Sequence, residues 1–233
     1  MPRIITTACG DLTGDGAREI IRLTGSQPAH SVAWRNIRLE IMDGASGKVT
    51  RLGLAQDTGY EPQLFLGDMT GRARSDVMVS IASGGSGGIV DSTIFAYMDG
   101  AYRQIFSTEE YYAAADYRVT YQDCYTVLAE SLLNHTAYMI DLSGRDEEYL
   151  SEIYDENGIL REPREGFVDP VSLLIAADID RDGVLELMAW QRISGLYHAD
   201  ALGDFISTLA WDGQRFALTS QTVGITGMEM MGQ

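Results

Sequence analysis

The sequence predicts an all-β protein, a β-propeller-like array of about four four-stranded antiparallel blades with one short helix in the third unit. Three observations lead to this fold class: an acid-rich motif that recurs along the chain, an Asp-Gly turn at a constant distance after it, and alternating apolar runs around both. They predict a single domain over residues 1–233, with repeat units at approximately 1–61, 62–116, 117–170 and 171–233.

The acid-rich motif occurs twice in full and once in a weaker form. Residues 11–19 (DLTGDGARE) and 178–186 (DIDRDGVLE) share acids at the first, fifth and ninth positions and a glycine at the sixth. Residues 68–76 (DMTGRARSD) keep the first, third and ninth positions but have Arg72 and Ala73 in place of Asp-Gly. The motifs start 57 and then 110 residues apart, so a unit without the motif is expected near Asp123.

The second marker is a tight turn 31 to 34 residues after each motif. Asp43, Asp99 and Asp212 are each followed by glycine, and residues 155–158 (DENG) lie at the matching distance in the third unit. Asp-Gly between alternating apolar runs predicts a hairpin, because both residues accept the positive φ of a type I′ turn.

The runs around these markers have the periodicity of strands. Apolar residues alternate over 37–41 and 77–81, and apolar runs at 62–67 and 171–177 enter two of the acidic loops. Four strands in about 55 residues is the size of a propeller blade. The expected helix is 146–154, where acids in the first turn precede apolar residues at helical spacing.

The chain is strongly acidic, with 34 Asp and Glu against 17 Lys and Arg and a formal charge of −17. This charge argues against nucleic-acid partners, since phosphates would be repelled. No run approaches the roughly 20 apolar residues of a membrane helix, so no membrane insertion is expected, and residues 1–10 lack a signal-peptide pattern. Localisation stays unknown. Cys9 and Cys124 allow one disulfide, although two free thiols are favoured.

The two full motifs predict sites for about two structural calcium ions. Oxygens at the first, third, fifth and ninth positions, with a glycine for the sharp turn, suit a hard cation with flexible coordination. The expected ligands include the backbone carbonyls of Ala17 and Val184 and are Asp11, Thr13, Asp15, Ala17, Glu19, Asp178, Asp180, Asp182, Val184 and Glu186.

The middle motif is expected to be a degenerate, metal-like loop without calcium. Its polar residues are Asp68, Thr70, Arg72 and Asp76. The Arg72 guanidinium is expected to replace the ion by pairing with Asp68 and Asp76.

EF-hand loops and plain polar turns are the alternatives to calcium-binding hairpin loops. An EF-hand needs Glu at position twelve, where this chain has Arg22 and Ala189, and strand-like rather than helical flanks surround both loops. Plain polar β-turns are less favoured, because crowded carboxylates repel one another unless a cation is present.

These motifs resemble FG-GAP, or VCBS, repeats such as those of integrin α-subunit propellers and many bacterial proteins. The residues concerned are 10–19, 66–71 and 177–186, and the whole chain is similar to an uncharacterised group of bacterial VCBS-repeat proteins through 65–68, 83–88 and 146–150. The resemblance implies a propeller with structural calcium between the first two strands of a blade, ligands on the opposite face, and no enzyme activity.

The opposite face is the expected ligand surface. It would be formed by the loops at 25–35, 83–91 and 195–204, because function concentrates in loops on a rigid scaffold. The candidate residues are His30, Trp34, Ser83, Ser86, Asp91, Tyr197, His198 and Asp200.

The function expected from the sequence is a non-enzymatic, calcium-binding scaffold for adhesion or binding, a monomer with a protein or glycan ligand. The alternative is a hydrolase or lyase acting on a glycan on the face opposite the calcium loops. Residues 84–88 (GGSGG) match G-x-S-x-G, but a strand-like run follows them where a nucleophile elbow needs a helix.

Overall fold

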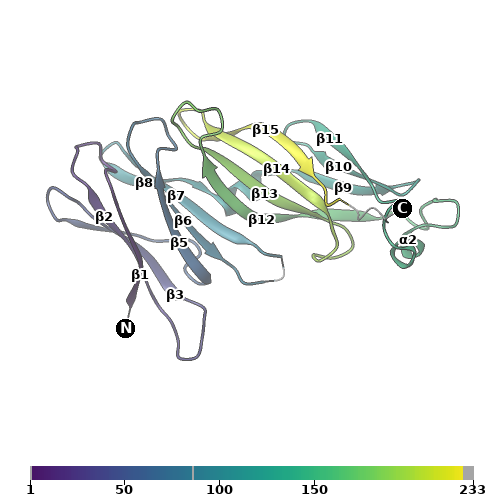
Figure 1. Ribbon diagram of the computed structural model, residues 1–233, viewed down its shortest axis with the longest axis horizontal. Helices are drawn as coiled ribbons and strands as arrows, with labels where there is room; N and C mark the ends of the chain where they lie inside the picture. The colour runs from purple at the N-terminus through teal and green to yellow at the C-terminus, as the bar shows by residue number, and fades with distance from the viewer. Residues whose placement is uncertain (1, 86, 228–233) are drawn as a thin grey trace, which may run out of the picture.

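The computed structural model describes residues 2–85 and 87–227. Over these described residues the chain is mostly antiparallel β-strand with two short helices, which confirms the all-β class. Its strands form three sheets that follow one another along the long axis of the molecule (Figure 1).

Sheet 1 and sheet 2 are four-stranded meanders of consecutive antiparallel strands. Sheet 1 contains β1 (Arg3–Gly10), β2 (Glu19–Ser26), β3 (Arg35–Met42) and β4 (Val49–Leu52). Sheet 2 contains β5 (Tyr60–Gly67), β6 (Asp76–Ala82), β7 (Val90–Met98) and β8 (Ala101–Ser107). Strand alternation explains how they pack: Ile21 and Leu23 of β2 are fully buried in a core shared with Val77 and Val79 of β6.

Sheet 3 has seven strands in the order β11-β10-β9-β12-β13-β14-β15. They are β9 (Tyr117–Gln122), β10 (Thr126–Ser131), β11 (Thr136–Asp141), β12 (Glu165–Ala177), β13 (Glu186–Ser194), β14 (Ala201–Trp211) and β15 (Phe216–Gly224). Its edges meet, because Tyr138 of β11 donates a hydrogen bond to the carbonyl of Gln221 in β15 at 2.8 Å. Sheet 3 is therefore a nearly closed, barrel-like sheet.

The prediction of four separate blades needs correction, because sheet 3 combines the strands of two predicted blades. The strands predicted as a third and a fourth blade join through β12, whose first residues pair with β9 and whose later residues pair with β13. β12 changes partner between Gly166, which pairs with β9, and Phe167, which pairs with β13, and its register with β13 then shifts between Val168 and Val171. Alternation within single strands gives no signal for this exchange of neighbours.

Two helices complete the part of the fold that the structure describes. The predicted helix at 146–154 is confirmed as α2 (Glu147–Ile153), whose N-cap Asp146 accepts from the Tyr149 amide at 2.8 Å. The sequence prediction missed α1 (Thr108–Ala114), which follows β8 directly. None of the helices in the described ranges is long and apolar enough to cross a membrane.

Candidate metal centre

The three acid-rich motifs form loops at corresponding places in the three sheets. Loop A (residues 11–19) joins β1 to β2, loop B (68–76) joins β5 to β6, and loop C (178–186) joins β12 to β13. Because the strands of each meander alternate in direction, the three loops lie at the same end of their sheets as the turns after Asp43, Asp99 and Asp212.

In all three loops, the first carboxylate is held by backbone amides of its own loop. Asp11 accepts from Gly14 and Gly16 at 2.7 and 3.0 Å. Asp68 accepts from four amides of loop B, the shortest bond being 2.6 Å from Ala73. Asp178 accepts from Asp182 and Gly183 at 3.1 and 3.2 Å. The loops therefore share one conformation.

The ninth acid of each loop closes it from the other side. Glu19, Asp76 and Glu186 accept from the amide of the second loop residue, at 2.6, 3.0 and 2.8 Å respectively. All three side chains are buried, which places a carboxylate beneath each loop.

Loop C brings three carboxylates into metal-binding distance. One oxygen from each of Asp178, Asp180 and Glu186 lies within 4.8 Å of the other two. Asp182 is not part of this group: its carboxylate accepts from the Val184 amide at 2.7 Å. Of the five ligands predicted in loop C, Asp178, Asp180 and Glu186 therefore lie together, whereas the Asp182 carboxylate is bound within the loop's own turn.

Loop A has two side-chain oxygens without a hydrogen-bond partner among the described residues. They are Oε1 of Glu19, whose side chain is fully buried, and Oγ1 of Thr13. The Asp15 carboxylate instead accepts from the Ala17 amide at 2.8 Å, as Asp182 does in loop C. A buried carboxylate oxygen without a donor is costly, and a bound cation would remove that cost.

In loop B, the residues at the third and ninth positions, Thr70 and Asp76, form a hydrogen bond with each other. The Thr70 hydroxyl donates to Oδ2 of Asp76 at 2.9 Å, a bond whose equivalent is missing between Thr13 and Glu19. Burial raises the pKa of Asp76, with the Thr70 and Met69 hydrogen bonds acting in the opposite direction. The ninth acid of loop B therefore has a hydroxyl donor that the ninth acid of loop A lacks.

The predicted role of Arg72 needs correction. Its backbone amide donates to Asp68 at 3.1 Å, but its guanidinium forms no ion pair with Asp68 or Asp76, both of which are described. The carboxylates of loop B are stabilised by amides and a hydroxyl rather than by a guanidinium, because the loop wraps its backbone around Asp68.

The three loops stack directly on one another in the order A, B, C. The Ser75 amide of loop B donates to the Asp11 carbonyl at 2.9 Å, and the Leu185 amide of loop C donates to the Asp68 carbonyl at 2.8 Å. In each case, the eighth residue of one loop binds the first residue of the loop before it. No loop of the 117–170 segment intervenes, because its strands extend the far side of sheet 3.

Arg74 and Gly67 contribute to the packing of the loops against one another and against sheet 2. The Arg74 guanidinium donates to the carbonyls of Thr13 and Tyr97 at 2.8 and 2.5 Å. A Cβ atom at Gly67 would meet the end of the Leu185 side chain, so the glycine lets loop C approach sheet 2 without moving that side chain.

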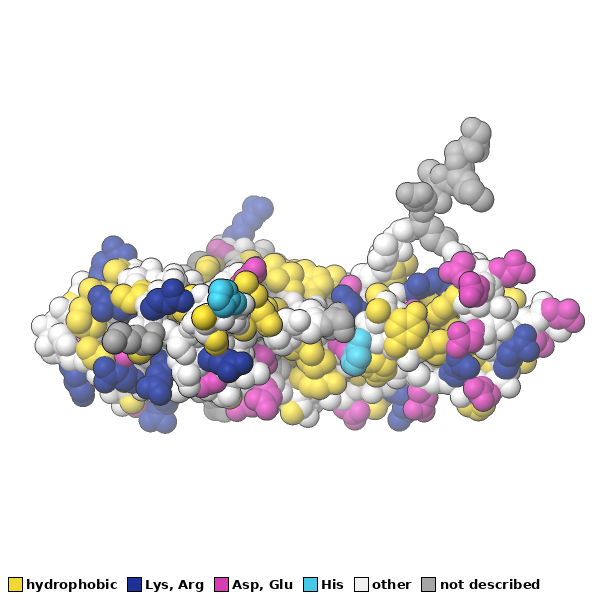
Figure 2. Space-filling view, turned by 90° about the horizontal axis from the view of Figure 1, so that it is seen from below, with side chains coloured by type: hydrophobic (Ala, Val, Ile, Leu, Met, Phe, Trp, Pro, Cys, Tyr) yellow, Lys and Arg dark blue, Asp and Glu magenta, His cyan; other side chains and the backbone are white. Residues whose placement is uncertain are grey.

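The expected ligand-face residues lie at the opposite end of the sheets but do not converge on one site. Trp34 pairs with Gly59 at the edge of sheet 1, where Arg3 stacks over its ring. His30 and Ser83 lie in separate loops of sheets 1 and 2, and Ser86 lies outside the described residues. Figure 2, seen from below, shows histidine side chains at separate places on this side.

The loop after β13 contains the remaining candidates. Nδ1 of His198 lies 2.5 Å from Oδ1 of Asp169, a fully buried carboxylate that also accepts from the Ser194 hydroxyl at 2.6 Å. Asp200 accepts from Tyr149 and from the Leu196 amide, both at 2.9 Å, while Tyr197 is 60% exposed. These bonds fix the loop onto β12 and α2.

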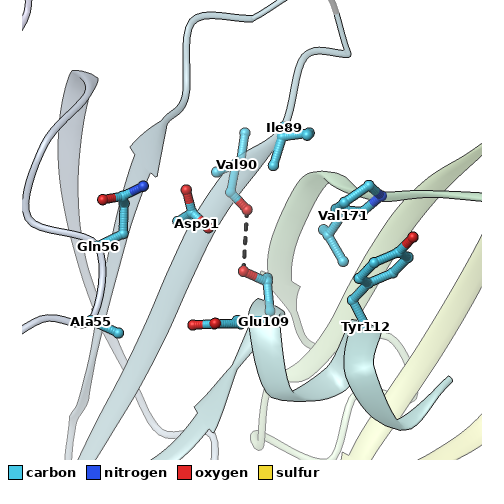
Figure 3. Close-up of a pocket in the computed structure, with 10 residues that line it drawn as sticks. Ala55, Gln56, Ile89, Val90, Asp91, Glu109, Tyr112 and Val171 are labelled. Atoms are coloured by element: carbon cyan, nitrogen blue, oxygen red, sulfur yellow. Dashed lines mark hydrogen bonds between the residues drawn. The ribbon is translucent and has the colours of Figure 1, made fainter. Parts of the chain in front are cut away.

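A pocket of about 300 Å³ opens where the three sheets meet, at the end opposite the acidic loops. Figure 3 shows Asp91 of β7 and Glu109 of α1 on the side of Gln56, with the Tyr112 ring and Val171 on the other side. Burial raises the pKa of Asp91, and the nearby Glu109 carboxylate raises it further. Of the predicted ligand-face residues that the structure describes, Asp91 alone lines this pocket.

Several site residues were missed by sequence reasoning. Glu109 and Tyr112 depend on α1, whose start has the capping-box pattern: Ser107 accepts from the amide of Glu110, three residues later, at 3.2 Å. That pattern is readable in the sequence. For Asp169, the sequence contains no pattern that points to a site, apart from the Pro170 that follows it.

The cysteines show no disulfide. Cys9 and Cys124 are both free and exposed.

Comparisons with known proteins agree with the boundaries of sheet 3. The family model of the YybI C-terminal domain matches residues 115–224, which span β9 to β15. The "Uncharacterized protein YybI" of Bacillus subtilis (strain 168) is 44% identical over 227 residues, covering 97% of this chain and 87% of that protein. No solved structure matches.

These matches overturn the resemblance to FG-GAP or VCBS repeats. That resemblance depended on the nine-residue acidic loops. The acids of these loops are needed to accept hydrogen bonds from the loop's own amides, so they indicate this loop conformation rather than a particular family. The match over nearly the whole length shows that the chain belongs to the YybI family.

Proposed function

We propose that the protein is a calcium-stabilised binding scaffold, with ions in loops A and C and a ligand at the other end of the sheets. The observation that carries the proposal is the group of Asp178, Asp180 and Glu186, whose carboxylate oxygens lie within 4.8 Å of one another. The unpartnered, buried Glu19 oxygen supports a second ion in loop A.

Calcium fits this donor set better than other ions. The loops offer carboxylates, a hydroxyl and backbone carbonyls but neither histidine nor thiol, which disfavours softer metals. Magnesium requires a tighter octahedron and retains several waters, whereas calcium accepts irregular oxygen cages. Loop B is expected to bind no ion, since Thr70 already satisfies Asp76.

The ions would strengthen the contacts between sheets. Each hydrogen bond between loops has a proposed calcium loop on one side: loop A accepts from Ser75, and loop C donates through Leu185. A ligand that binds only the folded state stabilises it by about 2.7 kcal/mol at 100 times its Kd. Calcium is thus expected to raise the stability of the whole stack.

A calorimetric calcium titration of chelator-stripped protein tests the proposal, with the melting temperature followed in parallel and magnesium as control. Two sites per chain are expected, with a rise in melting temperature specific to calcium. No heat of binding and no shift would overturn it.

Substitutions in loop C test which residues hold each calcium ion. Asp180→Asn with Glu186→Gln is expected to remove one of the two sites, because it neutralises two of the three clustered carboxylates of loop C. Asp212→Asn is the matched control: Asp212 lies at the same end of the sheets and caps its own turn through Arg215 and Gln214. Loss of a site in the control alone would contradict the assignment.

A hydrolase or lyase acting on a glycan is the second candidate, and the pocket in Figure 3 is what favours it. Glycan cleavage uses two carboxyl groups, one of which holds a proton near neutral pH. Asp91 has a raised pKa next to Glu109, which suits it to the role of acid.

Release of reducing sugar from mixed polysaccharides tests this candidate. Activity lost in both Asp91→Asn and Glu109→Gln, but kept in Glu110→Gln on the same helix, would support it. Glycan binding without any cleavage would favour the scaffold instead.

A further inference from the structure

The outer face of sheet 1 is not covered by any other described part of the chain. Even-numbered residues of β2 and β3 point away from sheet 2, because Ile21, Leu23, Leu39 and Ile41 fill the core between the two sheets. A cross-strand row on this outer face runs through Thr7, Arg22, Glu40 and Arg51.

This face is basic, with exposed apolar residues at its edges. Arg22, Arg38 and Arg51 lie on it against one acid, Glu40, which pairs with Arg51 at 2.8 Å. Nε of Arg22 is buried without a hydrogen-bond partner in the described chain. Ile4 and Val49 are 57% and 42% exposed. We call this surface the sheet 1 outer face.

Its charge is opposite to that of the rest of the molecule. Residues 1–52 contain seven basic and five acidic residues, whereas residues 53–233 contain ten basic and 29 acidic ones. In Figure 2, dark blue side chains gather at the sheet 1 end, while most magenta ones lie toward the far end, where dark blue ones also occur. The protein is therefore electrically polar along its long axis.

The far end carries α2 and its flanking loops (Figure 1). Glu147, Glu148 and Glu156 are exposed there and form no ion pair with another described residue. We call this surface the α2 end. Its carboxylates are available to arginines of another molecule.

We propose that the sheet 1 outer face docks the α2 end of a second copy of this chain. Charge complementarity selects this occupant, since guanidinium–carboxylate pairs are the favourable contacts that both surfaces offer. Two sheet 1 outer faces would oppose three arginines to three arginines, so a symmetric dimer through this face is disfavoured. The contact is heterologous, and repetition of it gives an open chain of molecules rather than a closed dimer. This departs from the monomer expected from the sequence.

Sedimentation at several protein concentrations tests the proposal, with chelator present so that the result is independent of the calcium sites. At about 50 mM salt, we expect the average mass to rise with concentration above the 25.6 kDa of one chain. At about 500 mM salt, where charges are screened, the mass is expected to return to that of one chain.

A charge-swap pair separates this contact from general electrostatic association. Arg38→Glu with Arg51→Glu, and Glu147→Lys with Glu148→Lys, are each expected to weaken association at least tenfold. A mixture of the two variants is expected to restore it, because each then offers the complement of the other. Arg103→Glu with Arg215→Glu is the matched control: these arginines are exposed at hairpins elsewhere, and their replacement is expected to leave association unchanged.

Three outcomes would overturn the proposal. They are a single-chain mass at all salt concentrations, association that the control variant weakens equally, and failure of the mixture to recover when both variants keep the wild-type circular dichroism and melting temperature. Binding of heparin, used as a polyanion probe, to single chains through Arg38 and Arg51 would assign the face to a different occupant.

Discussion

Arg74 links the first two acidic loops through two backbone carbonyls rather than through an acid. Its guanidinium donates to Thr13 of loop A and to Tyr97 of β7, so one side chain fixes loop A against sheet 2. Hydrogen bonds from a charged donor are stronger than neutral ones, and their loss leaves both carbonyls without this partner.

Replacement of Arg74 therefore has a predicted cost. We expect Arg74→Ala to lower the free energy of unfolding by about 2 kcal/mol in urea denaturation. Arg72→Ala is the control, because its backbone bond to Asp68 survives the change and its guanidinium holds no ion pair in the described chain. Equal losses in both variants would contradict the role given to Arg74.

Asp76 gives a prediction about pH. Burial raises its pKa in the folded state, so folding favours the protonated form and its ionisation opposes folding as pH rises. Asp76→Asn keeps an oxygen for the Met69 and Thr70 donors. We expect this variant to be at least as stable as the wild type at pH 7, with the difference shrinking as pH falls toward 4.

The opposite behaviour is expected of Asp212. The Arg215 and Gln214 amides lower its pKa, so its contribution to stability is present at neutral pH and is lost as pH falls through the lowered pKa. Asp212→Asn is therefore expected to be less stable than the wild type at pH 7 and equal to it in acid. Urea denaturation at both pH values distinguishes the two aspartates, and matching pH profiles would contradict these assignments.

At the scale of elements, the interior of sheet 3 depends on tyrosines that stay protonated. Burial raises the pKa of Tyr121 to about 12, with Asp200 acting in the same direction and the Tyr149 hydrogen bond opposing it. Burial likewise raises the pKa of Tyr154 to about 12. Both belong to the core enclosed by the curled sheet.

Sheet 3 is therefore expected to lose stability in alkali. An unfolded tyrosine ionises near pH 10, so above that pH the unfolded state gains an ionisation that the folded state resists until about pH 12. Tyr121→Phe is expected to move the onset of alkaline unfolding to higher pH. Tyrosinate absorbance together with circular dichroism measures it, and Tyr197→Phe, an exposed position, is the control.

The elements differ in how far the sequence could predict them. Loops A, B and C were predictable, because acids at the first and ninth positions are the residues that accept from the loop amides. Helix α1 carried a readable signal in Ser107 and Glu110. The union of two predicted blades through β12 had none, because it depends on which distant strand pairs with each half of β12.

At the scale of the whole molecule, the order of the stack could not be read from repeat spacing. Regular spacing placed a third unit between loops B and C, yet Leu185 binds Asp68 directly. Gly67, the residue before Asp68, has no side chain and leaves room there for the Leu185 side chain. Such complementarity between residues more than a hundred positions apart has no local pattern in one sequence.

For the same reason, the sequence could predict only those site residues that lie close together along the chain. The carboxylates of loop C were found from their spacing alone, since they belong to one turn. The pocket that joins Asp91 to Glu109 and Gln56 draws on three separate segments, and Asp169 of β12 meets His198 of the loop that follows β13. Those groupings exist only in the assembled fold.

We propose that calcium strengthens the row formed by the three acidic loops, and hydrogen exchange at two backbone amides can test this. Ser75 and Leu185 donate the bonds between loops, so both amides are predicted to exchange slowly in chelator and more slowly still with calcium. The amide of Gln214, in the exposed turn after Asp212, serves as the reference that calcium leaves unchanged. Exchange at Ser75 and Leu185 as fast as at that turn, or protection that calcium does not alter, would contradict the claim.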